Sequence, residues 1–209
     1  ELIIGIADMA VFDELTPEAV APAAAVSGTG EAMVLDANLP AATLAFLAGV
    51  AMEDGRPVAA VGVSPVKAMR LAPILGRIGY LFATRREAAA LLARPDAAAL
   101  ATRDLALGLA GLGAGHVIVT DSGNPLAAAA GSEAHLFPPF PSRVVSVNGA
   151  GDSLAAGLLH GLAAGRGFFD AVLHGLGAAA ITVEDAGTVA AGMSAAAVED
   201  RVARARVVT

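Results

Sequence analysis

The sequence contains no cysteine, few aromatic side chains and no excess of positive charge. The absence of cysteine excludes disulfide bonds, thiolate metal sites and a cysteine nucleophile. Because disulfides are rare in the cytoplasm, the same absence favours a cytoplasmic location. Lysine and arginine number 13 against 20 acidic residues, which gives a net charge of -7. Such a chain has no basic stripe for a phosphate backbone, and we expect no nucleic-acid partner.

Long apolar runs are also missing. The longest uncharged apolar stretch, Leu39–Met52, has 14 residues and contains Pro40 and Gly49. It is too short to cross a bilayer, so we expect no membrane partner. The opening residues, Glu1–Ala7, lack the basic region of a signal peptide. Because the first residue is Glu1 and not Met, we expect the chain to be part of a longer protein.

The composition is that of a folded chain. Its 209 residues are 56% apolar and 16% charged, with a mean hydropathy of +0.68, which argues against disorder. Short apolar β-type runs alternate with helical patterns, and a hydroxyl, a proline and an acid at Thr16, Pro17 and Glu18 indicate a helix start. The expected strands are Leu2–Ala7, Met33–Asp36, Val58–Val63, Tyr80–Ala83, His116–Thr120 and Arg143–Val147. This alternation predicts an α/β fold with a parallel sheet covered on both faces.

The pattern changes towards the end of the chain. Residues 126–140 form short runs broken by Gly131 and several prolines, which predicts a hairpin or meander. From Gly149 onward the chain is expected to be mostly helical. We find no linker or repeat, and residues 1–209 are interpreted as one domain.

The strongest chemical motif is V-N-G-A-G-D-S, at Val147–Ser153, which leads into an apolar helical pattern. We interpret it as a strand, a glycine turn and a helix. Gly149 and Gly151 allow close approach of the backbone to a ligand. The free N–H groups and the dipole of the helix N-terminus favour a phosphate or a developing oxyanion. Asp152 could accept a proton from an attacking hydroxyl beside this site.

A second G-A-G sequence, Gly113–Gly115, serves as an internal comparison. His116 and a β-type run follow it, so it has neither the carboxylate nor the helix, and we interpret it as a loop. It also fails as a dinucleotide fingerprint, which must open a helix, and this argues against a dehydrogenase. The four histidines show no metal-ligand spacing; they are His116, His135, His160 and His174.

With this motif the sequence resembles the ribokinase-like (PfkB) family of carbohydrate and nucleoside kinases, whose signature is the G-A-G-D turn. Further segments match in order and spacing, and they are most similar to pseudouridine kinases. These segments are E-L-I-I-G-I-A-D-M at 1–9, V-L-D-A-N-L-P at 34–40, V-S-P-V-K-A-M-R-L at 63–71, L-F-A-T-R-R-E-A at 81–88 and V-I-V-T at 117–120. The resemblance implies a three-layer α/β/α sandwich with a mostly parallel central sheet. It also implies ATP-dependent phosphorylation of a sugar or nucleoside hydroxymethyl group, with pseudouridine preferred.

The resemblance assigns roles to particular residues. Asp152 is the catalytic base, and Gly149, Ala150 and Gly151 form the anion hole. Glu87 matches the acid of an N-x-x-E motif that organises Mg²⁺ through water. Asn38 falls where relatives place a polar group facing the sugar. The expected nucleotide-binding residues are Thr84, Glu87, Thr120, Ser122, Gly123 and Asn148.

Structural alternatives stay open for several of these positions. Glu87 could be a charge at a helix start, Thr120 a cap at a strand end, and Asn38 part of an Asx-turn. Lys67 is interpreted as a solvated lysine. Basic residues near the C-terminus are interpreted as an exposed face balanced by neighbouring acids.

The chain departs from the family pattern near the expected nucleotide site. Thr84 replaces the asparagine of N-x-x-E, and Ser122 and Pro125 replace turn glycines unless a shift of one residue places Gly123 there. Ser146 replaces an acidic residue that helps hold a monovalent cation in some relatives, which makes such a cation doubtful. Gly62 and Val63 stand where pseudouridine kinases tend to have Asp-Pro.

The resemblance also concerns the front of the chain. Family members begin with a di-glycine sugar-binding motif and a small β-sheet lid, and Glu1 already aligns after them. We therefore expect the C-terminal, nucleotide-binding portion of a longer kinase, which lacks the β-lid. Two hypotheses follow: an ATP-dependent kinase of sugars or nucleosides, of the pseudouridine or the ribokinase and fructokinase type, or a non-catalytic nucleotide-binding remnant. The resemblance allows a homodimer, since relatives often dimerise through the lid.

Overall fold

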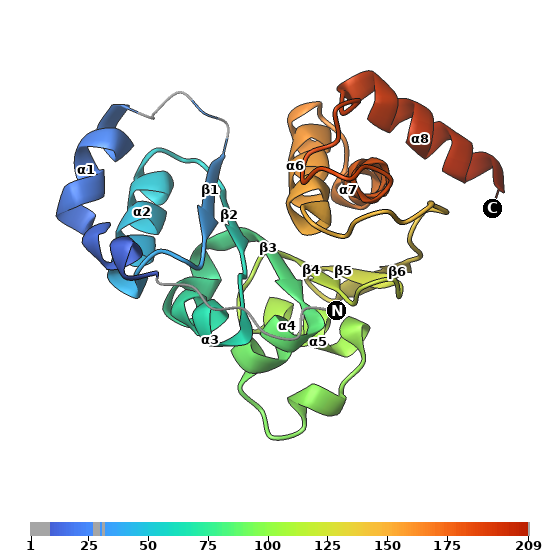
Figure 1. Cartoon of the computed structure of the whole chain (residues 1–209). Helices are drawn as coiled ribbons and strands as arrows, with labels where there is room; N and C mark the ends of the chain where they lie inside the picture. Colours follow the sequence, from blue (N-terminus) through green and yellow to red (C-terminus); the bar gives the residue numbers. More distant parts are fainter. Residues whose placement is uncertain (1–8, 27–29, 31, 209) are drawn as a thin grey trace. The chain divides into compact units, whose positions relative to one another are not determined.

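The computed structural model describes residues 9–26, 30 and 32–208. The expected strand Leu2–Ala7 lies outside the described residues. The chain divides into two compact units, one formed by Glu1–Asp121 with Ala129–His135, the other by Ser122–Ala128 with Leu136–Thr209. Each unit is described by itself below, with the elements labelled in Figure 1.

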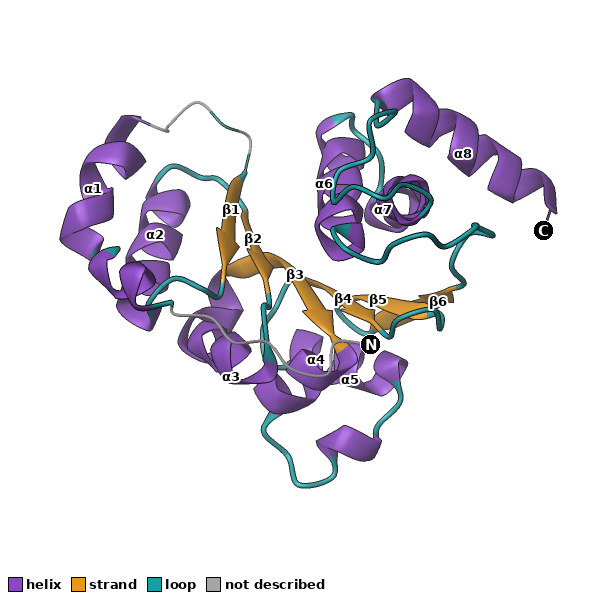
Figure 2. Ribbon diagram, viewed as in Figure 1, coloured by secondary structure: helices purple, strands orange, loops and turns teal. Residues whose placement is uncertain are grey.

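The first unit alternates helices and strands, as its sequence predicts. A short 3-10 helix, Ala10–Glu14, precedes them. The order is α1 (Pro17–Val26), β1 (Met33–Asp36), α2 (Ala41–Glu53), β2 (Val58–Val61), α3 (Pro65–Ala68), the 3-10 helix Met69–Arg77, β3 (Ile78–Thr84), α4 (Arg85–Leu92), the 3-10 helix Ala97–Ala99, α5 (Thr102–Gly111) and β4 (His116–Thr120). Figure 2 shows α4 and α5 together beside β3 and β4. The expected start of α1 is confirmed, since the Ala19 N–H donates to Thr16 Oγ1.

The sheet is six-stranded and has the order β1-β2-β3-β4-β5-β6, with β5 at Leu126–Ala130 and β6 at Glu133–Phe137. The first four strands are parallel neighbours, so the predicted parallel sheet is confirmed. In β2, β3 and β4 most side chains are buried, as at Ala60, Leu81 and Ile118, because helices connect parallel strands across the sheet faces. In β1 buried and exposed residues alternate. The expected hairpin is also confirmed, since only residues 131–132 separate β5 from β6, and Gly131 has a positive φ of 58°.

The second unit is built on helices α6 (Ala150–Ala163), α7 (Phe168–Val183) and α8 (Ala195–Val208). Helices α6 and α7 approach closely because glycines face each other. A Cβ on Gly157 would lie 2.7 Å from the His174 carbonyl oxygen, and one on Gly175 would lie 2.7 Å from that of Leu154. Helix α8 packs on α7 as well, with Val198 and Val202 in one buried cluster with Ala178.

The expected strand Arg143–Val147 is wrong, since this segment is neither strand nor helix. Its valines have β propensity, but the exposed fractions of Val144 and Val147 are 63% and 70%. The backbone is held by a helix end and not by a neighbouring strand, because the N–H groups of Val145 and Ser146 donate to the Val183 carbonyl at 2.7 and 3.2 Å. Within the part of the chain that the structure describes, no helix is long and apolar enough to cross a membrane.

Candidate functional site

The glycine turn before α6 has a geometry that only glycine tolerates. Gly149 is the N-cap of α6, with φ of 78° and ψ of -4°. A Cβ at this position would lie 1.9 Å from the carbonyl oxygen of Thr188. Both the left-handed backbone and the close approach of another chain segment therefore require the glycine.

The first turn of α6 offers backbone donors. The N–H groups of Gly151 and Asp152 have no hydrogen-bond partner among the described residues, as expected at a helix N-terminus. The Ala150 N–H differs, because it donates to the Val147 carbonyl at 3.3 Å. The two free donors and the helix dipole make this turn suited to an anion.

Asp152 lies in that first turn and is exposed. No hydrogen bond or ion pair holds its carboxylate among the described residues. A carboxylate that is free and accessible can accept a proton from an attacking hydroxyl. The unpaired N–H groups beside it can stabilise the negative charge on the phosphoryl group that the hydroxyl attacks.

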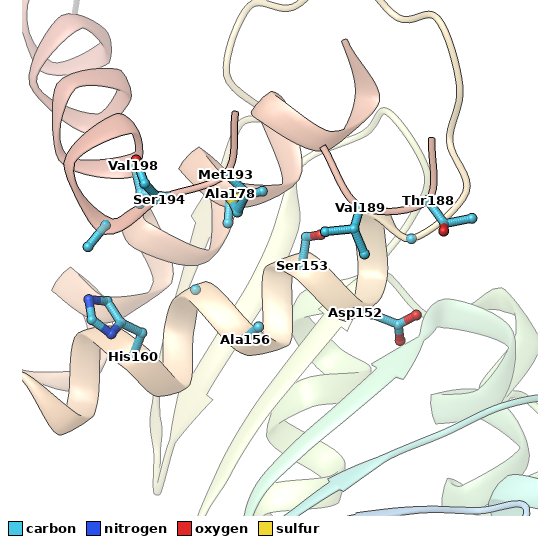
Figure 3. Close-up of a pocket in the computed structure, with 13 residues that line it drawn as sticks. Asp152, Ser153, Ala156, His160, Ala178, Thr188, Val189, Met193, Ser194 and Val198 are labelled. Carbon is cyan, nitrogen blue, oxygen red and sulfur yellow. The ribbon is translucent and has the colours of Figure 1, made fainter. Parts of the chain in front are cut away.

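A cavity of about 480 Å³ lies along α6 within the second unit. Figure 3 shows the Ser153 hydroxyl beside Val189, whereas the Asp152 carboxylate leaves the helix in a different direction. Apolar and hydroxyl-bearing side chains form most of the wall. The lining residues are Gly149, Asp152, Ser153, Ala156, Gly157, His160, Ala178, Thr188, Val189, Met193, Ser194, Ala195 and Val198.

The residues just before the glycine turn form a local hydrogen bond with each other. The Ser146 hydroxyl accepts the Asn148 N–H at 3.2 Å, and the Asn148 side chain is exposed. Ser146 thus closes a local turn where relatives carry an acid. No group of histidine, cysteine, aspartate or glutamate among the described residues is arranged to hold a metal ion by itself.

In the first unit, Thr84 and Glu87 form a capping box at the start of α4. The Thr84 N–H donates to Glu87 Oε2 at 2.9 Å, and the Glu87 N–H donates to Thr84 Oγ1 at 3.4 Å. Only 5% of Glu87 is exposed. The helix-start interpretation of Glu87 is therefore confirmed, and one carboxylate oxygen stays without a partner among the described residues.

Gly62 makes room for that buried carboxylate. A Cβ at Gly62 would lie 2.6 Å from Glu87 Oε2. An aspartate here, as in the Asp-Pro pair expected of pseudouridine kinases, would crowd a second carboxylate against the first. The departure at Gly62 and the position of Glu87 are thus physically linked.

Thr120 ends β4 directly beside Thr84, the last residue of β3. The turn that follows β4 contains Ser122, whose φ of 52° is left-handed, whereas Gly123 does not have a positive φ. The backbone conformation expected of a turn glycine therefore occurs at Ser122. This favours the alignment without a gap over the one-residue shift to Gly123.

Asn38 follows β1, and its Oδ1 accepts a hydrogen bond from Lys67 Nζ at 2.6 Å. Lys67 is half-buried, so its interpretation as a solvated lysine is wrong. The Asx-turn in this loop belongs to Asp36, whose Oδ1 accepts the Asn38 N–H at 2.7 Å. With Oδ1 occupied, the Asn38 side chain has its NH₂ group left for a ligand.

Arg70 is a residue that the sequence analysis missed. Its Nη1 donates to the Asn38 carbonyl at 2.7 Å and to those of Ala37 and Leu39 at 3.3 Å. It thereby fixes the loop that carries Asn38. The only signal in the sequence was its place in the segment 63–71, which by itself gave it no role.

The expected site residues divide between the two units. The first unit contains Asn38, Thr84, Glu87 and Thr120. Thr84 and Thr120 end parallel strands, and Asn38 and Glu87 come shortly after such an end, at the edge where ligands bind in open α/β sheets. The second unit contains Ser122, Gly123, Asn148, Gly149, Ala150, Gly151 and Asp152.

Comparison with known proteins gives consistent matches. The family model described as pfkB family carbohydrate kinase matches residues 3–195. A carbohydrate kinase from Agrobacterium tumefaciens is 32% identical, with a TM-score of 0.81 over 97% of this chain and 64% of that one. An adenosine kinase from Sinorhizobium meliloti is 26% identical, with a TM-score of 0.71 over 94% and 59% of the two chains.

A ribokinase from Thermotoga maritima, 23% identical, has the same fold, with a TM-score of 0.75 over 91% of this chain and 62% of that one. The expected ribokinase-like α/β fold is therefore confirmed. The chain spans less than two thirds of the length of each of these structures. A search of curated proteins gave no significant match.

Proposed function

This chain belongs to the pfkB family of carbohydrate kinases, and on that basis we propose that the protein transfers the γ-phosphoryl group of ATP to a hydroxymethyl group of a small sugar or nucleoside. The observation that carries this proposal is the exposed, unpaired Asp152 beside the free N–H groups of Gly151 and Asp152 itself. The proposed base and the proposed anion site would thus lie in one turn of helix.

In the proposed reaction, Asp152 accepts the proton of the acceptor hydroxyl. The hydroxyl oxygen forms a bond to the γ-phosphorus of ATP, the bond from that phosphorus to the β–γ bridging oxygen breaks, and ADP leaves. The N–H groups of Gly149, Gly151 and Asp152 would stabilise the charge on the transferred group. Ala150, expected in the anion hole, would contribute its N–H only after giving up its bond to Val147.

The residues fit Mg²⁺ only in a water-mediated mode. The carboxylate oxygen of Glu87 that does not accept the Thr84 N–H would face a hydrated ion, and Mg²⁺ in phosphoryl-transfer sites typically retains waters and uses one or two carboxylates. The ion would neutralise charge on the ATP phosphates. The nucleotide itself would be bound by Thr84, Thr120, Ser122, Gly123 and Asn148, and Asn38 would face the acceptor.

Pseudouridine is the acceptor that the quoted sequence segments favour, with pseudouridine 5′-phosphate as the product. Similarity to both a carbohydrate kinase and an adenosine kinase supports the broader class of sugar or nucleoside. Gly62 argues for testing acceptors broadly, because it departs from the pseudouridine-kinase pattern at a position coupled to Glu87.

A non-catalytic nucleotide-binding protein is the second candidate. Two observations favour it: Glu87 and Thr84 already satisfy each other in the capping box, and Ser122 holds a strained backbone where relatives have glycine. In this case ATP would bind without being consumed, and the Asp152 carboxylate would not take part in a reaction.

The test is a mass-spectrometric phosphorylation assay with MgATP and pseudouridine, uridine, adenosine, ribose or fructose. Asp152→Asn is the test variant, and Asp104→Asn, an exposed acid in the first turn of α5, is the matched control. A product that forms with the wild type and the control but not with Asp152→Asn supports the kinase. Retained turnover in Asp152→Asn contradicts it, and ATP binding by calorimetry with no product supports the second candidate.

A further inference from the structure

We infer that Thr182, on the last turn of α7, is a positioning residue for the turn that carries Asp152; this rests on the proposed function of that turn. Thr182 is fully buried. Its Oγ1 donates a hydrogen bond to the hydroxyl oxygen of Ser153 at 2.7 Å, a favourable distance for an O–H···O bond. Ser153 is the residue directly after Asp152.

The partner of this hydroxyl is unusual for a threonine inside a helix. Threonine hydroxyls in helices often bond to the carbonyl one turn earlier in the same helix. Here the bond runs from α7 to α6, between two side chains. It therefore links the second helix to the first turn of α6, at the residue after the proposed base.

The next residue of α7 holds the other side of the same turn. The carbonyl of Val183, at the end of the helix, accepts the N–H groups of Val145 and Ser146 at 2.7 and 3.2 Å. Thr182 and Val183, which we call the α7 anchor, thus fix the chain both after and before the glycine turn.

The middle of the turn is fixed by the segment that follows α7. The Thr188 carbonyl oxygen occupies the space beside Gly149, where a Cβ would come within 1.9 Å. The position of Asp152 is consequently set from α7 and its following loop. Displacement of a reacting group by about 1 Å can reduce a rate ~100-fold, so loss of the anchor should act on catalysis.

Further contacts extend the anchor to the segment that precedes the turn. Glu184 accepts the Arg143 N–H at 3.3 Å and pairs with Arg201 of α8, which also donates to the Pro141 carbonyl. The segment 143–147, which was expected to be a strand, is therefore an ordered connection that is hydrogen-bonded to residues at the end of α7. Its order supports a fixed position for the residues that follow it.

The variant Thr182→Val removes the hydroxyl and keeps the shape, and Thr182→Ser restores a hydroxyl. Thr43→Val is the matched control, since Thr43 is equally buried and its Oγ1 donates to the Leu15 carbonyl at 2.6 Å in the first unit. We expect Thr182→Val to lower kcat about 10- to 100-fold with KM for MgATP and acceptor within about twofold. Thr182→Ser should recover most of kcat, and Thr43→Val should lower only Tm.

Ser153→Ala should produce the same loss of kcat as Thr182→Val, and the double variant should be no worse than either, since both remove one hydrogen bond. An unchanged kcat in Thr182→Val would overturn the inference. So would a loss of kcat in Thr182→Ser as large as that in Thr182→Val, or additive losses of kcat in the double variant.

A second measurement does not depend on turnover. Amide hydrogen exchange of Val145, Ser146 and Ser153 should accelerate at least about fivefold in Thr182→Val and not in Thr43→Val. If the wild type phosphorylates no acceptor, the proposed function fails, and exchange alone then decides the inference. Unchanged exchange at these amides in Thr182→Val would contradict the α7 anchor.

Discussion

The carbonyl oxygen of Thr188 lies against the backbone of Gly149, at a distance that leaves no room for a side chain. Because the φ of Gly149 is also positive, Gly149→Ala combines a steric clash with an unfavourable backbone conformation. We expect it to lower the free energy of unfolding by about 2–4 kcal/mol. Urea denaturation followed by circular dichroism measures this loss.

Gly151→Ala is the control for that substitution. A Cβ on Gly151 meets nothing within 4 Å, and alanine is a better helix former than glycine. We expect stability to be unchanged or to rise by up to about 1 kcal/mol, while phosphorylation falls because the new methyl group lies at the proposed phosphate site. A strongly destabilised Gly151→Ala variant would contradict the geometry of this turn.

Glu87 allows its structural and chemical roles to be separated. Glutamine can replace glutamate in a capping box, so Glu87→Gln should retain Tm, whereas Glu87→Ala should lose about 1 kcal/mol of stability. If Glu87 organises hydrated Mg²⁺, Glu87→Gln will nonetheless require about tenfold more Mg²⁺ for half-maximal activity. An unchanged Mg²⁺ dependence in Glu87→Gln would show that Glu87 caps the helix and does not organise Mg²⁺.

Ser122 adopts a left-handed backbone that glycine adopts without strain. Ser122→Gly should therefore stabilise the protein by roughly 0.5–1 kcal/mol, despite the greater freedom of glycine in the unfolded chain. Ala93→Gly provides a comparison, since Ala93 ends α4 with a φ of 51°. Thermal denaturation of both variants tests this, and a destabilised Ser122→Gly would show that the serine side chain makes a necessary contact.

Asp185 gives a prediction about pH. Hydrogen bonds from the Gly187 N–H first, and then from Ala191 and Ala186, hold the pKa of this carboxyl below its ordinary value of 3.8. Because the folded-state pKa is lowered, the stabilisation is fully present above pH 3.8 and is lost as pH falls through the folded-state pKa.

Asp185→Asn should thus be less stable than the wild type near neutral pH, and the difference should shrink in acid. Urea midpoints of both proteins at about pH 7, about pH 5 and about pH 3 provide the measurement. Another exposed acid, Asp200, which pairs with Arg204 on α8, offers a control through Asp200→Asn. A difference that grows towards low pH would contradict the assignment.

Much of the fold could be predicted from the sequence. Apolar runs such as His116–Thr120 identified the parallel strands, and Gly131 marked the hairpin, because both signals are local. The run Arg143–Val147 was misread for a reason that is not local. Its valines favour a strand, but the carbonyl of Val183, 38 positions after Val145, takes the N–H groups that a neighbouring strand would have used.

The candidate site divides in the same way. The glycine turn and the position of Asp152 were predictable, since the motif itself contains the N–H donors and the proposed base. Arg70 and Thr182 were not, because each acts through a contact with residues distant in sequence, at Asn38 and Ser153. No pattern of residue types distinguishes these side chains from other polar residues of a helix.

The capping box at Thr84 and Glu87 has a consequence for how this chain would change over evolutionary time. Glu87 stabilises a helix, so selection for a folded protein alone would keep it, even in a lineage without enzymatic activity. Asp152 makes no hydrogen bond or ion pair among the described residues, and any of several polar residues could replace it in such a lineage. A glutamate retained at 87 would therefore be explained by folding alone, whereas an aspartate retained at 152 would argue for the proposed catalytic role.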